Sequence, residues 1–175
     1  SLGVAKREVK TELLPDGSAN VTFEFNLENF GNVNLSGISL VDDLSASFGA
    51  PCAVSVMSLT SDDFIVNAAY DGTTDTELLA AGNSLPVGDK GAVLVTINVA
   101  GCGDTQTSFI NTATAEGTAP DGSTTTDNSV DGPDPDGTDE DGNPDEESGT
   151  GVSFDQQPSL GVAKREVKTE LLPDG

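Results

Sequence analysis

The chain has no histidine and no tryptophan, and only seven of its 175 residues are lysine or arginine. Without histidine it lacks the commonest general base and the commonest nitrogen ligand for metals. Thirty acidic residues give a formal net charge of −23. Binding to nucleic acid relies on lysine and arginine contacts to phosphate, so we expect no nucleic-acid partner.

Two further absences limit the classes of function that we expect. No apolar run is long enough to span a membrane. The chain also lacks a G-x-S-x-G motif, a glycine-rich phosphate loop and any base beside its serines and threonines. Asp42 and Asp43 are adjacent carboxylates, but neighbours on a strand point to opposite faces, whereas glycoside hydrolysis needs both in one cleft. We therefore expect that the protein is not an enzyme.

Residues 1–17, SLGVAKREVKTELLPDG, recur unchanged as residues 159–175. This repetition predicts one unit of a tandem array, followed by the first strand of the next identical unit. Such arrays usually span distance. In a second interpretation, the second copy is a donor strand that completes a neighbouring subunit. A cloning artefact is a third.

Alternation of apolar and polar residues with a period of two predicts strands over residues 1–130. The clearest are 19–27 and 92–99. The others are 3–14, 33–41, 52–59, 63–70, 107–116 and 123–130, while 77–81 fits either an edge strand or one helical turn. Eight or nine strands separated by turn signals, with no convincing helix, predict an all-β antiparallel sandwich.

The composition changes after residue 130. Residues 131–158 contain no lysine or arginine and little that is apolar beyond Val152 and Phe154. Such a segment buries too little surface to offset the entropy of ordering it. We therefore expect a sandwich domain over 1–130, an acidic irregular linker over 131–158, and the first strand of the next repeat over 159–175.

Several short motifs, in this order, resemble one family. They are GVAK at 3–6, DG at 16–17, VTFEF at 21–25, NFGNV at 29–33, LSGISLVDDL at 35–44 and NTATAEG at 111–117. They are similar to the Ig-like "conserved repeat" domain, of unknown molecular function, found in large bacterial surface proteins. The resemblance implies a secreted Ig-like β-sandwich in tandem arrays that form adhesin stalks or surface fibres. It implies no catalytic residues.

The stretch 131–147, DGPDPDGTDEDGNPDEE, contains spaced carboxylates with glycines after two D-x-D pairs. Calcium takes six to eight oxygen ligands from flexible loops, although the EF-hand spacing is not met because Gly137 comes too early. The candidate ligands are Asp131, Asp134, Asp136, Asp139, Asp141, Asp145 and Glu147. Calcium there would stiffen the joint between units. The alternative is a solvated, self-repelling linker.

Two covalent links are candidates. Cys52 and Cys102 lack metal-site spacing and predict a disulfide formed in an oxidising compartment, the alternative being two buried free thiols. Some surface β-sandwiches join a first-strand lysine to a last-strand asparagine by an isopeptide bond, aided by a buried acid. Lys6 and Asn111 hold comparable positions. We nevertheless expect an exposed lysine and a strand-edge asparagine, because buried lysine is rare.

These observations predict a structural repeat unit of a long extracellular filament or adhesin stalk on a bacterial cell surface. Its partners would be neighbouring copies of the same repeat, covalent in tandem or joined by strand addition. The alternative is a module that binds carbohydrate or protein, although such sites commonly use exposed aromatic side chains and few are available here.

Overall fold

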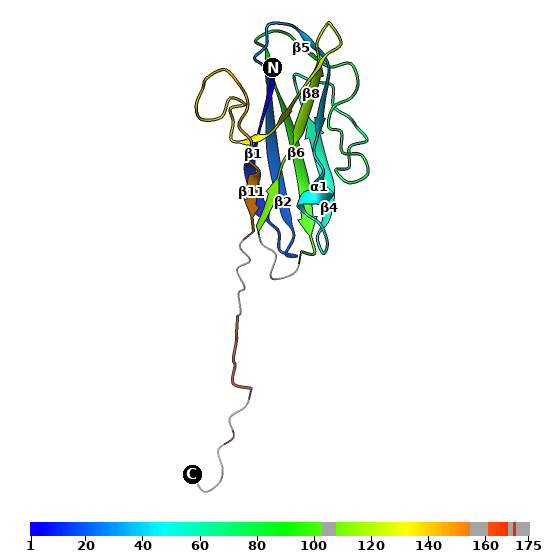
Figure 1. The fold of residues 1–175 in the computed structure, drawn as a ribbon. Coiled ribbons are helices and arrows are strands. Elements are labelled where there is room, and N and C mark those ends of the chain that lie inside the picture. The colour runs from blue at the N-terminus through cyan, green and yellow to red at the C-terminus, as the bar shows by residue number, and fades with distance from the viewer. Residues whose placement is uncertain (103–107, 155–160, 168–169, 171–175) are drawn as a thin grey trace.

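The computed structural model describes residues 1–102, 108–154, 161–167 and 170. These residues form strands and a single one-turn helix, which confirms the predicted all-β fold (Figure 1). The strands are β1 (Leu2–Leu13), β2 (Ala19–Asn29), β3 (Leu35–Val41), β4 (Ala53–Thr60), β5 (Ser84–Leu85), β6 (Lys90–Ala100), β7 (Ser108–Asn111), β8 (Thr114–Thr118), β9 (Thr124–Asn128), β10 (Val130–Asp131) and β11 (Thr150–Ser153). The helix is α1 (Leu44–Ser47). In the described part of the chain, no helix is long and apolar enough to cross a membrane.

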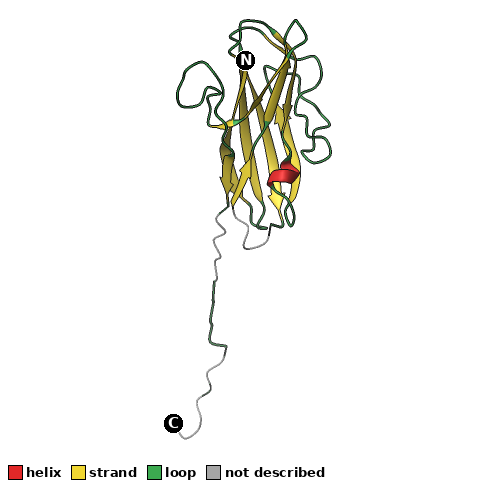
Figure 2. Cartoon of the chain, viewed as in Figure 1, coloured by secondary structure: helices red, strands yellow, loops and turns green. Residues whose placement is uncertain are grey.

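The strands pack as a sandwich. One sheet has the order β10-β1-β2-β6-β4, and the other has the order β5-β3-β8-β9. A third, two-stranded sheet of β11 and β7 closes the side next to β1 (Figure 2). β1 pairs antiparallel with β2 on one side and parallel with β10 on the other. The first strand is therefore enclosed rather than left at an edge.

The clearest sequence patterns form the centre of the core. In β2 and β6 the alternate apolar side chains face the second sheet and are fully buried, as expected for strands with one wet face. They are Val21, Phe23, Phe25, Leu27, Val93, Val95 and Ile97. The two strands pair without a register shift, and this pairing places the two rows side by side.

The predicted disulfide is present. Cys52 precedes β4 and Cys102 follows β6, and the two are bonded to each other. β4 pairs with β6 in the same sheet, which brings both cysteines to one end of the sandwich. A link across a sequence separation of 50 residues stabilises the fold by about 2–4 kcal/mol by constraining the unfolded chain.

Two expected strands differ from the structure. The segment 63–70 is a loop with one isolated bridge, at Val66. Its apolar alternation arises because Phe64 and Tyr70 insert into the core, while Ile65 is 61% exposed. The expected strand at 107–116, of which residue 107 lies outside the described residues, is two strands. β7 pairs with β11 and β8 with β3, so the chain changes sheets after Asn111.

The sandwich extends beyond residue 130, where we expected a linker to begin. β10 pairs with β1, and β11 pairs with β7. Phe154 packs against Phe109 with ring centroids 5.3 Å apart, and Phe109 packs against Phe48 at 4.9 Å. The acidic residues 132–149 therefore form a loop within the domain. Sequence pattern missed β11 because only Val152 and Phe154 mark it.

The second copy of the repeated segment is described only at 161–167 and 170. Its expected role as the first strand of a further unit lies largely outside the described residues. Where it is described, the copy is exposed. Val162 is 84% exposed, whereas Val4, the matching residue of β1, is fully buried.

We predict that Phe154→Ala destabilises the domain by about 3–5 kcal/mol, because it removes a buried aromatic ring from the core. Urea unfolding followed by circular dichroism measures the change. Val162→Ala, which alters an exposed residue outside the sandwich, should leave the midpoint unchanged. A Phe154 variant as stable as wild type would place the domain boundary before β11.

Candidate functional site

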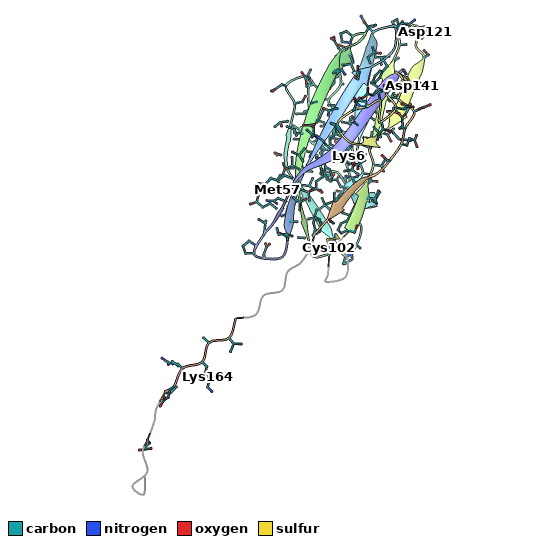
Figure 3. All side chains as sticks on the ribbon, turned by 90° about the vertical axis from the view of Figure 1, so that its left-hand side faces the viewer. Lys6, Met57, Cys102, Asp121, Asp141 and Lys164 are labelled. Carbon is teal, nitrogen blue, oxygen red and sulfur yellow. A yellow bond between two sulfur atoms is a disulfide. The ribbon has the colours of Figure 1, made fainter. Side chains whose placement is uncertain are left out.

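Lys6 is fully buried in the middle of the sandwich (Figure 3). It lies on β1, where the residues from Leu2 to Lys6 are all buried because the strand is covered on both faces. Lys6 O accepts hydrogen bonds from Gly132 N at 3.0 Å and from Thr150 Oγ1 at 2.8 Å. The expectation of an exposed Lys6 is therefore wrong. Asn111 stands at the end of β7, as expected of a strand-edge residue, but it is fully buried as well.

Three polar side chains converge at this point. Lys6 Nζ lies 2.9 Å from Asp42 Oδ2, and Asn111 Nδ2 donates to the same oxygen at 3.3 Å. Lys6 belongs to the five-stranded sheet, Asp42 follows β3, and Asn111 ends β7. Because Asp42 is also fully buried, all three sheets contribute one polar group to a dry cluster.

Aromatic rings form the floor of the cluster. Lys6 Nζ lies 4.6 Å from the centroid of the Phe23 ring and 4.9 Å from that of Phe25. Such contacts favour a cation, but they also exclude water. Burial lowers the pKa of Lys6, and the charge of Asp42 and its hydrogen bond to Nζ act in the opposite direction. A buried amine with a lowered pKa loses its proton more easily and becomes a better nucleophile.

The asparagine is held at both ends of its side chain. Ser47 Oγ donates to Asn111 Oδ1 at 2.8 Å, while Asn111 Nδ2 faces Asp42. Ser47 is positioned by α1, whose first turn is capped by Asp43, with Ala46 N donating to the Asp43 side chain. A hydroxyl donating to an amide oxygen stabilises negative charge that develops there during nucleophilic attack.

Asp42 keeps one free acceptor. Its Oδ1 atom is buried and has no hydrogen-bond partner within the described part of the chain. The Tyr70 hydroxyl donates to the backbone oxygen of Asp42 at 3.3 Å and closes the cluster from the side of the 61–83 loop. Burial, with the charge of Asp42 next, raises the pKa of Tyr70 far above its ordinary value, so this hydroxyl keeps its proton.

The arrangement brings a nucleophile, an acid–base group and an amide together without water. A lysine amine can displace ammonia from a carboxamide when the carbonyl is polarised and a nearby acid protonates the leaving nitrogen. Sequence reasoning had named Lys6 and Asn111 but missed Asp42 and Ser47. For Asp42 the available signal was its place at the end of the strand motif LSGISLVDD.

The predicted calcium ligands separate into two groups. Three of them, Asp136, Asp139 and Asp141, each place a carboxylate oxygen within 4.8 Å of the others. The other four lie outside this group. Asp131 lies in β10, Asp134 Oδ1 accepts from Asp136 N, Asp145 Oδ2 from Asn143 Nδ2, and Glu147 Oε1 from Asn128 Nδ2.

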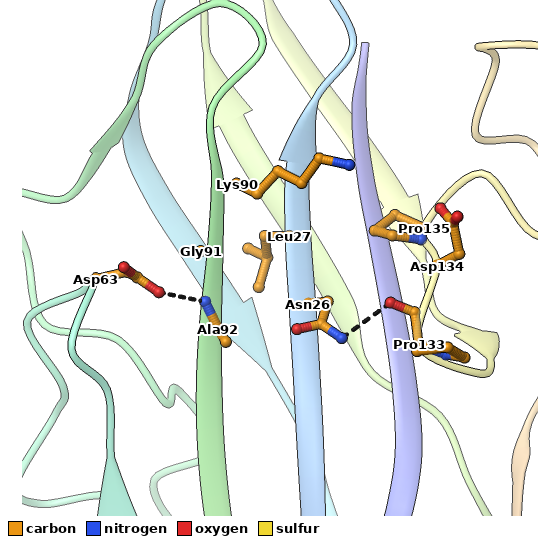
Figure 4. Close-up of a pocket in the computed structure, with 9 residues that line it drawn as sticks. All are labelled: Asn26, Leu27, Asp63, Lys90, Gly91, Ala92, Pro133, Asp134 and Pro135. Atoms are coloured by element: carbon orange, nitrogen blue, oxygen red, sulfur yellow. Dashed lines mark hydrogen bonds between the residues drawn. The ribbon is translucent and has the colours of Figure 1, made fainter.

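The start of the acidic loop crosses the outer face of the five-stranded sheet and leaves a pocket of about 340 Å³ there (Figure 4). Its polar groups already have partners within the chain. Asn26 Nδ2 donates to Pro133 O at 2.9 Å, and Ala92 N donates to Asp63 Oδ2 at 2.8 Å. No aromatic side chain lines it. The pocket is therefore a seam between loop and sheet, with nothing that points to a particular ligand.

Comparison with known proteins shows no family for this chain. No protein-family model matches the chain, and no curated protein matches it in sequence. Membership of the conserved-repeat family therefore stays a prediction.

A major pilin subunit of Bacillus cereus overlaps with a TM-score of 0.44 at 9% identity, covering 74% of this chain and 39% of the pilin. A family 123 glycoside hydrolase of Clostridium perfringens overlaps with a TM-score of 0.25 at 12% identity, covering 75% of this chain and 27% of the hydrolase. The chain thus spans about two fifths of the first protein and about a quarter of the second.

The beginning of β1 is also held by a titratable group. Asp127 Oδ2 accepts a hydrogen bond from Val4 N at 2.7 Å. Burial raises the pKa of Asp127 to about 6, the Val4 hydrogen bond opposes this, and the nearby charges of Glu147 and Glu146 add to it. The folded chain therefore holds this proton more tightly than the unfolded chain does.

We predict that stability falls as the pH rises from about 4 to about 6, because the folded state then loses a proton that it binds better than the unfolded state. Asp127→Asn should reduce this slope, to which the raised pKa of Glu77 also contributes, and should stabilise the domain at neutral pH by about 1–2 kcal/mol after allowance for solvent screening. Urea unfolding midpoints measured between pH 4 and pH 6 test this prediction. A chelator is included so that metal binding does not contribute.

The matched control is Asp121→Asn. A hydrogen bond from Ser123 lowers the pKa of Asp121, so this carboxyl acts only below about pH 4. The control should keep the wild-type slope. Parallel profiles for wild type and the Asp127 variant would contradict the assignment.

Proposed function

We propose that this domain is a load-bearing structural unit of an extracellular bacterial surface fibre, and that an amide bond between Lys6 and Asn111 locks it. The buried cluster of Lys6, Asp42 and Asn111 is the observation that carries the proposal. A buried ion pair contributes little to stability and is often replaceable by apolar side chains. Because the Lys6–Asp42 pair is fully buried beside the carboxamide of Asn111, we infer that it is present for its reactivity.

The reaction balances without any co-reactant. Asp42 takes a proton from the Lys6 ammonium. The neutral Nζ then attacks Cγ of Asn111, whose Oδ1 atom accepts a hydrogen bond from the Ser47 hydroxyl. Asp42 relays a second proton from Nζ to Nδ2, the Cγ–Nδ2 bond breaks, and ammonia leaves. One C–N bond forms, one breaks, and nothing is oxidised or reduced. The folded chain performs this step once, so it is a maturation step and not a turnover.

The position of the bond suits a mechanical role. The N-terminus lies at one end of the sandwich and β11 leaves at the other (Figure 1). Tension that enters at β1 would pass through Lys6 to Asn111 and bypass residues 7–110. A link closing a loop of about 100 residues also stabilises the fold by about 4–5 kcal/mol through the unfolded state.

The remaining features agree with a fibre outside the cell. The disulfide suits an oxidising compartment. The exact recurrence of residues 1–17 at 159–175 supports units that follow one another in one polypeptide. The sequence predicted that calcium would stiffen the joint between units. In this proposal calcium would instead stiffen the domain itself, because the acidic residues lie within it.

A second candidate, strand addition between molecules, is favoured by one observation. The described residues 161–167 are exposed, whereas the same sequence in β1 is largely buried. Such a segment could replace β1 in a neighbouring chain, and Lys164 would then occupy the position of Lys6. The product would be a covalent chain of molecules, not a locked monomer.

We predict that the mature protein has an intact mass lower than its sequence mass by one ammonia, in addition to the two hydrogens lost in the disulfide. Lys6→Arg should abolish the loss because its guanidinium stays protonated and is not a nucleophile. Ser47→Ala should form the bond about 10²–10³-fold more slowly, because it loses the hydroxyl that stabilises the oxyanion. Asp42→Asn should also slow the reaction, because it loses the proton acceptor. Mass spectrometry of denatured samples over time measures this.

Lys10→Arg is the matched control, since Lys10 is exposed and pairs with Glu12. It should keep the wild-type mass. A wild-type mass that equals the sequence mass with the disulfide alone would refute the locked unit. Covalent multimers on denaturing gels that vanish in Lys164→Arg would favour strand addition instead.

A further inference from the structure

The acidic residues 132–149 are fixed to the sandwich at several points. Asp131 N donates to Ser148 Oγ at 2.7 Å, which ties the start of the loop to its end. Pro135 and Pro144 pack on Gly3 of β1 so closely that an added Cβ there would lie 2.7 Å from the Cβ of Pro144. The loop thus folds back on the first strand, and its carboxylates are held rather than spread in solvent.

Within this loop one carboxylate is buried without full hydrogen bonding. Asp136 is 7% exposed, and only one of its oxygens has a partner, Gly142 N, which donates to Oδ2 at 2.9 Å. The other oxygen, Oδ1, is buried and accepts no hydrogen bond from any described residue. A buried carboxylate oxygen without a donor is strongly unfavourable unless a positive charge compensates it.

The surroundings of Asp136 are mostly negative. The charge of Lys90 reaches Asp136, but Lys90 is 68% exposed and its Nζ is already paired with Glu28 Oε2 at 2.7 Å. Asp139 and Asp141 bring carboxylate oxygens within 4.8 Å of it and of each other. Glu146 lies beside this group: its carboxyl is close to Gly137, the residue after Asp136, and its Oε2 atom is buried without a hydrogen-bond partner among the described residues. There is no lysine or arginine between residues 131 and 158.

The ligand chemistry selects the ion. All four side chains offer oxygen only, which suits hard cations and disfavours zinc and copper, which prefer nitrogen and sulfur. Several carboxylates on a glycine-containing loop match calcium, which accepts irregular coordination by six to eight oxygens. Magnesium demands near-ideal octahedral geometry and keeps more of its water.

We propose that Asp136, Asp139, Asp141 and Glu146 form a calcium site that clasps the loop between β10 and β11. The clasp acts inside one unit. It holds the two ends of the loop together, and these ends lead into β10, beside β1, and into β11, beside β7. Thr150, the first residue of β11, donates to Lys6 O and is paired with Asn111. Calcium therefore secures the strand that covers the reactive cluster.

The clasp also lies where the amide bond offers no protection. The proposed Lys6–Asn111 link shields residues 7–110 from tension, and the disulfide lies within that range. Residues 112–154 remain in the path of force, and the acidic loop is the longest irregular segment among the described residues there. This consequence rests on the proposed function, whereas the metal site does not.

Isothermal titration calorimetry of the full chain with calcium chloride, after chelator treatment, tests the site. We expect one calcium per chain with a dissociation constant of about 10⁻⁴–10⁻³ M or tighter, and at least about tenfold weaker binding of magnesium. Asp136→Asn should weaken calcium binding by at least about tenfold, since it removes the charge of the buried ligand and nearly keeps its shape.

Asp121→Asn is the matched control, because Asp121 is an exposed turn carboxylate that accepts hydrogen bonds from Ser123. It removes the same charge and should bind calcium as wild type does. Equal weakening in both variants, or no saturable heat with wild type, would overturn the proposal and indicate diffuse counterion attraction.

Two further measurements separate this inference from the amide bond. Lys6→Arg should bind calcium with the wild-type stoichiometry although it cannot form the amide bond. In wild type, normal calcium binding without the loss of ammonia would refute only the locked unit. Limited proteolysis should cut the loop between residues 132 and 149 faster in chelator than in calcium. Asp136→Asn should be cut rapidly in both, and a cutting rate in wild type that ignores calcium would contradict the clasp.

Discussion

A lysine ammonium beside an aspartate, sealed against two phenylalanine rings, is the constraint on which this fold depends. Lys6 and Asp42 are both fully buried, and each ion costs several kcal/mol to remove from water. Such a pair survives only where the packing around it excludes water and fixes its partners. The flanking strands β10 and β11, the one-turn helix that carries Ser47 and the loop that brings in Tyr70 all serve that enclosure.

The disulfide and the proposed Lys6–Asn111 bond would divide the chain into a part shielded from tension and a part that carries it. The disulfide between Cys52 and Cys102 is nested inside the loop that a Lys6–Asn111 bond would close. It therefore adds thermodynamic stability but bears no load once that bond has formed. In the proposed fibre, the residues that would bear load are those after Asn111, where the strands are short and the sequence most acidic. Reinforcement there has to come from something other than a cross-strand covalent bond, and an ion bound by side chains is suited to that.

Sequence reasoning predicted the sheets best where alternation is produced by a core on one side only, as in β2 and β6. It failed at 63–70, because loop side chains such as Phe64 can enter a core without forming a strand. It also missed β11, whose burial depends on Phe109 and Phe48, far away in sequence. For the site, it paired Lys6 with Asn111 by position but expected exposure, because a composition-based rule for lysine cannot register that β1 is covered on both faces. Asp42 was missed because its place at the end of the motif LSGISLVDD does not show that it packs against Lys6, and Glu146 because no local spacing marks it.

Placing the acidic segment inside the domain changes what an array of these units would look like. If units follow one another as the repeated sequence predicts, only residues 155–159 separate Phe154, the last buried residue of one sandwich, from Leu160, the counterpart of the buried Leu2. Five residues span at most about 18 Å even when fully extended. A joint so short limits bending between neighbours by steric contact alone. Stiffness of the fibre would then follow from the short joint, while the acidic loop with the proposed calcium ion would keep each unit closed.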